Sequence, residues 1–268
     1  APFFDRAESP FDIPGINTGF VPQDLDHVEA DDSWLFSGYM ADHSPSPLYR
    51  RAADGTITKF YVSLPDGSPY DGHGSAITTN EQYAYLACEE GYLVIPMDDL
   101  LFAEDGASVQ ATEKVDVDLS PAFMNIEQGQ LLLGNFYYPN DYETPENHHI
   151  TTPDGTENPA VMYAFAADPA EPGRFLTVPD NVFSIPGMVQ GTCITDDGRI
   201  VLSVSYGIAP SHLLAYNVNL AAPDGTFTTG SGDEVELFCL DSRNLTEDLV
   251  GPVSYTHLRA HETVLDLV

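Results

Sequence analysis

Two adjacent histidines stand among several carboxylates in residues 140–159, which read NDYETPENHHITTPDGTENP. Imidazole and carboxylate groups are common ligands of divalent metal ions. The segment is therefore a candidate metal site, with these residues as candidate ligands: His148, His149, Asp141, Asp154, Glu143 and Glu146. Adjacent histidines on a loop rarely both reach one ion, and no HExxH or similar zinc spacing occurs. The alternative is a long polar loop without a metal.

A second set of polar residues stands near the start of four similar apolar segments: Gln23, Asp24, His73, Asn125 and Gln190. If these segments converge on a channel, the side chains can bind a small polar ligand or a metal ion at its mouth. The alternative is that they satisfy backbone hydrogen bonds where the strands converge. His73 is the first of these to mutate, because a glycine on each side allows close approach of the backbone.

The sequence lacks the motifs of several other kinds of catalytic or nucleotide-binding site. There is no GxSxG elbow, P-loop or Rossmann glycine pattern. Ser211 and His212 are neighbours on a predicted strand, so their side chains point to opposite faces and cannot form a catalytic pair. The Asp-rich turns lack EF-hand spacing and are predicted to be ordinary turns. The three cysteines, with Cys88 and Cys193 inside apolar runs, indicate buried thiols rather than a disulfide framework.

The charge balance excludes two classes of partner. The 268 residues contain 42 acidic and 9 basic side chains, a formal net charge of −33. Nucleic acids and anionic membrane surfaces are polyanions and would be repelled. The sequence contains no run of about 20 apolar residues, so it predicts no membrane-spanning helix. The acidic surface favours solubility, and some of its carboxylates can collect calcium or a cationic ligand.

A strand unit of about 50 residues recurs along the chain. Residues 21–40 and 189–207 align with Gln23 on Gln190 and Tyr39 on Tyr206, and weaker copies begin near residues 73 and 122. Each copy predicts a hairpin and further short strands, which in the first copy lie at residues 46–52 and 57–64. Residues 97–106 predict the one short helix, and residues 140–159 a loop inserted in the third copy.

Four short antiparallel strands repeated at this period predict an all-β fold, a β-propeller of four-stranded blades. We expect four blades here and a truncated fifth. Residues 21–252 form the predicted propeller domain, and residues 1–20 an N-terminal segment that can close the ring. A β-sandwich is the competing architecture, but it does not require a recurring four-strand unit.

Two resemblances add to this prediction. The PQ leader, the SGYM and SVSYG strand ends and the SHLLAY strand resemble uncharacterised bacterial secreted or cell-envelope propellers, related loosely to lactonase-like and NHL-type propellers. This resemblance implies an extracellular or cell-envelope location and brings no catalytic residues; only Asn125 loosely matches the metal set of lactonase propellers. The last residues, 253–268, resemble translated sequencing-adapter read-through, which implies a non-native tail.

Two functional hypotheses follow. The first is a monomeric binding module outside the cytoplasm, with a small polar ligand, a glycan or a protein as partner. The second is a hydrolase or lactonase-type enzyme that uses Ca²⁺ at the central channel. Thermal melting with calcium and with chelator would separate them.

Overall fold

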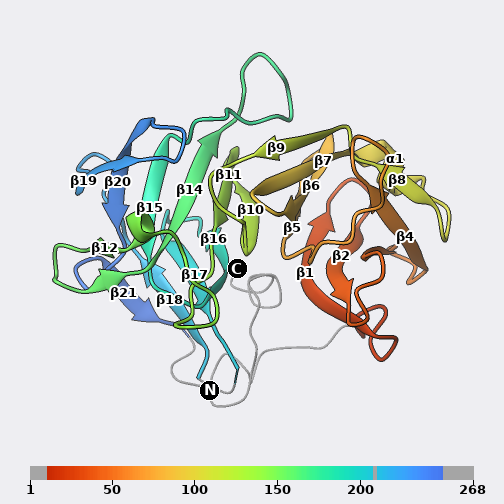
Figure 1. The fold of residues 1–268 in the computed structure, drawn as a ribbon, viewed down its shortest axis with the longest axis horizontal. Coiled ribbons are helices and arrows are strands. Elements are labelled where there is room, and N and C mark those ends of the chain that lie inside the picture. Colours follow the sequence, from red (N-terminus) through yellow and green to blue (C-terminus); the bar gives the residue numbers. More distant parts are fainter. Residues whose placement is uncertain (1–10, 208–209, 250–268) are drawn as a thin grey trace. The chain divides into compact units, whose positions relative to one another are not determined.

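The computed structural model describes residues 11–207 and 210–249, and these residues are nearly all strands and turns (Figure 1). They divide into two compact units, each considered separately below. The first unit comprises residues 11–121 and 168–174, and the second comprises residues 122–167, 175–207 and 210–249. No helix in this described part of the chain is long and apolar enough to cross a membrane.

The first unit holds two sheets. Blade 1 is an antiparallel meander with a fifth strand on its outer edge, in the order β1 (Phe20–Val28), β2 (Ser33–Met40), β3 (Pro47–Arg51), β4 (Ile57–Ser63) and β8 (Ser108–Gln110). Blade 2 has the order β5 (Ile77–Thr79), β6 (Tyr83–Cys88), β7 (Gly91–Pro96) and β9 (Glu113–Asp116). The predicted helix is confirmed as the short α1 (Met97–Leu101), which follows β7 directly.

The second unit repeats this plan. Blade 3 has the order β10 (Phe123–Glu127), β11 (Gln130–Gly134), β14 (Ala160–Ala166), β15 (Asn181–Ile185), β20 (Glu234–Cys239) and β19 (Gly225–Thr228). Blade 4 has the order β16 (Val189–Ile194), β17 (Ile200–Val204), β18 (His212–Tyr216) and β21 (Leu245–Asp248). Both sheets carry the hairpin and third strand expected from the sequence repeat.

Each unit exchanges strands in the same way. The chain leaves blade 2 after β7, adds β8 to the edge of blade 1 parallel to β4, and returns as β9. In the second unit it leaves blade 4 after β18, adds β20 to blade 3 parallel to β15, and returns as β21 (Figure 1). The repeating structural element is therefore a pair of blades.

These sheets are β-propeller blades, so the predicted fold class is confirmed with four blades, two in each unit. A fifth blade would need residues beyond 249. That prediction and the predicted non-native tail at 253–268 lie outside the described residues.

The core of each unit lies between its two sheets. In the first unit one buried cluster joins Leu35 and Phe60 of blade 1 to Ile77 and Leu93 of blade 2. In the second unit Phe123, Met162 and Phe183 of blade 3 join Leu202 and Val204 of blade 4. Full burial of side chains of this size contributes about 1.5–3 kcal/mol each, so the paired sheets are the main source of stability.

The predicted N-terminal segment is described from Phe11 onward. The Phe11 ring packs 5.9 Å from Trp34 and 6.1 Å from Phe36, with the guanidinium of Arg51 at 4.3 Å from its centroid. These residues lie on blade 1, so residues 11–19 cover one face of this sheet; ring closure by residues 1–20 stays a prediction.

The aligned glutamines occupy equivalent places. A register shift lies between Pro22 and Asp24 in β1 and between Val189 and Gly191 in β16, so Gln23 and Gln190 are both β-bulge residues. The aligned tyrosines are not equivalent. Tyr39 pairs within the ladder, whereas Tyr206 follows the end of β17, because the hairpin turn spans 29–32 in blade 1 and 195–199 in blade 4.

Four Asp-Gly pairs, with Gly55, Gly67, Gly155 and Gly198, form turns of one geometry. The glycine has a φ of +83° to +90°, and its N–H donates to the carbonyl three residues earlier, as in a type I turn followed by a left-handed residue. In the turns at Asp54, Asp66 and Asp154 the carboxylate also accepts the N–H two residues on. Hydrogen bonds lower the pKa of these aspartates.

We expect Gly134→Ala to destabilise the protein by about 1–3 kcal/mol, the usual cost of overpacking. A Cβ at Gly134 would lie 2.3 Å from the ring of Phe123, its buried partner in blade 3. Gly225→Ala is the matched control, because its Cβ would meet nothing closer than 4.0 Å. Urea unfolding measures both. Equal stability of the two variants would contradict the assigned packing.

Candidate functional site

In the first unit, two carboxylates of β1 hold β5 in place. Asp24 is buried, and its Oδ2 accepts the backbone N–H of Ile77 at 3.0 Å. Asp26 accepts the hydroxyl of Thr79 at 2.7 Å. Asp24 and Asp26 lie on the same side of the strand, the side on which blade 2 packs. Both therefore link the innermost strands of neighbouring blades.

In the second unit the corresponding strand, β10, uses an amide for the same purpose. Asn125 Nδ2 donates to the carbonyl of Thr192 in β16 and to Glu127 Oε1, both at 3.0 Å. Asn125 is buried, with 9% of its surface exposed. The structure thus places Asp24 and Asn125 as links between blades, the alternative given for them in the sequence analysis.

The two bulge glutamines make local contacts. Gln23 Nε2 donates to the carbonyl of Pro22, and Gln190 Nε2 donates to the carbonyl of Ser205, each at 3.2 Å. Both side chains are half-buried. His73 is exposed, and its ring stacks on Tyr39 with the centroids 4.5 Å apart and an interplanar angle of 14°. These contacts hold Tyr39 and His73 side by side between blades 1 and 2.

The candidate metal ligands of the insertion have separate partners. His148 is buried, its Nδ1 lies 2.9 Å from Asn135 Nδ2, and its ring packs against Phe227. His149 contacts Thr144 and, at 3.4 Å, Glu157. Asp141 accepts the hydroxyl of Tyr206, and Asp154 binds a different segment, described below. Among the described residues no group of three or more His, Cys, Asp or Glu side chains can hold a metal ion.

The insertion is also more ordered than the predicted loop. Residues 140–159 contain a 3-10 turn, η1 (Glu146–His148), and a two-stranded hairpin, β12 (Ile150–Thr151) and β13 (Glu157–Asn158). The predicted loop therefore contains short pieces of secondary structure, and contacts with distant residues hold it in place.

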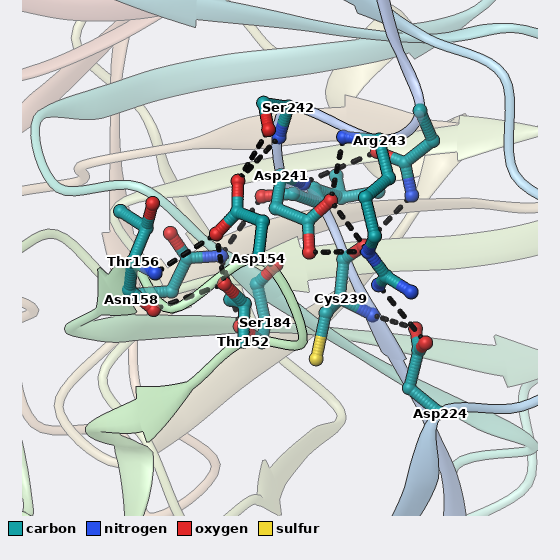
Figure 2. A network of polar contacts seen from close by, with 12 residues as sticks. Thr152, Asp154, Thr156, Asn158, Ser184, Asp224, Cys239, Asp241, Ser242 and Arg243 are labelled. Atoms are coloured by element: carbon teal, nitrogen blue, oxygen red, sulfur yellow. Dashed lines mark hydrogen bonds and ion pairs between the residues drawn. The ribbon is translucent and has the colours of Figure 1, made fainter.

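A polar network fastens this hairpin to the segment after β20 (Figure 2). Asp154 accepts the backbone N–H and the hydroxyl of Ser242 at 3.0 and 2.6 Å, as well as the Thr156 N–H at 2.8 Å. Hydrogen bonds, first of all that from Ser242, hold the pKa of Asp154 well below its usual range. Asn158 adds three bonds of 2.9–3.0 Å to Ser184 and to the carbonyl of Leu240.

Arg243 continues the network on the other side. Its guanidinium pairs with Asp241 and Asp224, each at 2.9 Å, and the Asp241 side chain is fully buried (Figure 2). Asp224 also accepts the backbone N–H of Cys239. Because these charged groups satisfy one another within the network, we assign it a structural role: it fixes the insertion and the exchanged strand β20 to blade 3.

The best candidate site is a group of rings that the sequence analysis did not single out. We call Phe136, Tyr138, Tyr142 and Tyr206 the aromatic patch. Ring centroids are 4.3 Å apart for Tyr138 and Tyr206, 5.4 Å for Phe136 and Tyr206, and 5.3 Å for Phe136 and Tyr142. Tyr142 is 48% exposed and the other three are half-buried. The patch therefore presents clustered rings at the surface.

Local backbone geometry brings these rings together. Tyr138 and Tyr142 exchange two backbone hydrogen bonds of 2.9 Å across a tight turn, which places both side chains on one side. Asn140 adopts a φ of +65° in this turn, and its N–H donates to Glu143 Oε1 at 2.7 Å. Phe136 precedes Tyr138 by two residues, and its ring contacts those of Tyr142 and Tyr206.

The fourth ring comes from blade 4. Tyr206 follows β17, and its hydroxyl donates to Asp141 Oδ2 at 2.6 Å. This hydrogen bond is the main reason why the pKa of Tyr206 rises to about 12. The hydrogen bond thus holds the Tyr206 hydroxyl at Asp141 while its ring packs against Tyr138. A sequence signal existed, because aromatics recur at the ends of second strands, at Tyr39, Phe136–Tyr138 and Tyr206.

No model of a known protein family matches the chain, and no curated protein matches it significantly. The functional proposal therefore rests on the geometry and the sequence of this chain.

We expect Asp154→Asn to lower the melting temperature at pH 7, because the amide loses acceptor capacity toward Ser242 and Thr156. A depressed folded-state pKa contributes stability above the unfolded pKa of about 3.9, and this contribution is lost as pH falls through the folded-state value. The difference from wild type should therefore narrow below about pH 4. Asp196→Asn, at an exposed position in another turn, is the control. A constant difference from pH 7 to pH 3 would contradict the assignment.

We expect the thiols of Cys193 and Cys239 to resist a thiol reagent at pH 8 in the native protein. Both are buried, and burial raises the pKa of Cys193 to about 12 and that of Cys239 to about 11. Thiolate is the reactive form. All three cysteines should react quickly in guanidinium chloride, which provides the internal control. Fast labelling of either buried thiol without denaturant would overturn this expectation.

Proposed function

We propose that the chain is a ligand-binding module that acts outside the cytoplasm and contacts its ligand with the aromatic patch. The observation that carries the proposal is the cluster of partly exposed rings on a turn closed by reciprocal hydrogen bonds. Tyrosines supply large contact areas at low conformational cost, which makes them frequent anchors in binding sites.

The patch is also pre-organised. The Tyr138–Tyr142 turn is closed by two backbone bonds, Glu143 binds its Asn140 N–H, and Asp141 holds Tyr206. The neighbouring Tyr137 carbonyl accepts the Met188 N–H at 3.0 Å, which ties this segment to the start of blade 4. Side chains that are ordered before binding lose less entropy when the ligand arrives.

The other sequence candidates support neither the binding hypothesis nor the calcium-dependent hydrolase. The sequence predicted either a small polar ligand or a metal ion at residues near the start of the innermost strands. Asp24 and Asn125 use their polar atoms to link blades, and His73 is stacked on Tyr39. These contacts link or stack groups within the first and second units and supply no separate support for a site at these residues. No observation on the described residues favours the hydrolase.

The location outside the cytoplasm rests on the sequence. The net charge of −33 favours solubility, as expected for a secreted or salt-exposed protein. The resemblance of residues 20–252 to bacterial secreted and cell-envelope propellers supports the same location.

The test is calorimetric titration with a panel of neutral oligosaccharides, organic cations, organic anions and short peptides. For any compound that binds, Tyr142→Ala should weaken affinity about tenfold, as expected for an aromatic anchor worth about 1.4 kcal/mol. Phe102→Ala is the control, because Phe102 is 81% exposed but lies in the first unit.

Affinity within twofold of wild type in both variants, for every bound compound, would refute the patch as the binding site. Circular dichroism and the melting temperature of each variant show that a loss of affinity is not a loss of fold.

A further inference from the structure

The aromatic patch carries carboxylates next to its rings. Asp141 and Glu143 lie on the same turn as Tyr138 and Tyr142, and both are exposed. Asp141 is in direct contact with Tyr206 through the 2.6 Å hydrogen bond. A ligand that lies on the rings is therefore close to negative charge.

The second unit offers these carboxylates little positive charge of its own. Its only Lys or Arg side chains among the described residues are Arg199 and Arg243. Arg199 pairs with Asp197 and Glu247, and Arg243 pairs with Asp224 and Asp241. Both arginines are thus already matched by two carboxylates elsewhere in the unit.

The rings, like the carboxylates, attract positive charge. The face of a tyrosine ring carries partial negative charge and attracts a cation that lies within about 6 Å of its centroid. Recognition of quaternary ammonium groups by several aromatic side chains is a known use of this interaction. At the patch, ring faces and carboxylates therefore act in the same direction.

From this combination we propose that the ligand of the aromatic patch is an organic cation of the quaternary ammonium class. The inference rests on the proposed binding function and adds the chemistry of the ligand. An anion would be repelled by Asp141, Glu143 and the net charge of −33.

A neutral sugar fits the patch less well. A sugar stacks best on one flat exposed ring, whereas these rings are tilted to each other by 42° to 88°. It also gains nothing from the two carboxylates. The inclined rings instead offer several faces to a compact, rounded cation such as a trimethylammonium group.

The experiment uses choline chloride as the probe and 3,3-dimethylbutan-1-ol as its neutral isostere, with calorimetry or NMR line shifts as the readout. Choline should bind at least about tenfold more tightly than the isostere, since only the cation gains the attraction of the ring faces and carboxylates. Its affinity should fall when NaCl is raised from about 0.02 to 0.5 M, because salt screens exposed charges.

Two variants separate the rings from the charge. Tyr142→Ala should weaken choline binding about tenfold, whereas Asp141→Asn keeps the shape of the side chain and should reduce both the affinity and its salt dependence. Phe102→Ala should leave both unchanged. The folding of each variant is checked by its melting temperature.

The two proposals fail in different ways. Equal affinity for choline and the isostere, no choline binding, or tighter binding of a neutral sugar would overturn the cation inference. The binding function survives any of these if some panel compound still depends on Tyr142. Choline binding that is insensitive to Tyr142→Ala reflects only the general acidity of the protein and overturns the inference as well.

Discussion

Burial of apolar side chains between two neighbouring sheets is the interaction on which the rest of this structure depends. A short antiparallel sheet with two apolar faces is not stable alone, and here each sheet packs against a partner within its unit. The exchanged strands strengthen the pairing of the sheets. β8 lies in a connection of blade 2 but pairs with β4 of blade 1, and β20 lies in a connection of blade 4 but pairs with β15 of blade 3. They also cover the outer edges of β4 and β15, which would otherwise be open to pairing with other chains. The pair of blades is thus both the packing unit and the repeating unit.

The packing of neighbouring sheets also explains the hydrogen bonds of several polar residues. Asp24 and Asp26 in the first unit, and Asn125 in the second, satisfy groups on the innermost strand of the adjacent blade. The insertion is treated in the same way: its hairpin is held by Asp154 and Asn158 through bonds to residues more than twenty positions away. A buried polar group without such a partner would destabilise the fold, so side chains that look reactive in the sequence serve as connectors.

The proposed binding surface lies near the end of a second strand, where the chain leaves the sheet. Tyr39 with His73 in the first unit, and the aromatic patch in the second, gather at such ends. Side chains there are held by the adjoining strands but are not buried in the core. That combination of rigid support and exposure is what a recognition surface needs.

The sequence by itself determined most strands of the repeat, the short helix, several Asp-Gly turns and the buried thiol of Cys193, whereas Cys88, also expected to be buried, is half-buried. Each depends on local alternation, on a glycine with positive φ, or on an apolar neighbourhood, all of which are written in adjacent residues. Strands β8, β19, β20 and β21 were not predicted, because no local repeat marks them, and β8 and β20 pair with a strand of another blade. The sequence identified candidate residues by their side-chain type but could not assign their roles. The partners of Asp24, Asn125 and Asp154 lie 53, 67 and 88 positions away. Only the packing of blades decides which distant groups meet, and that decided both which polar residues became connectors and which rings came together at the surface.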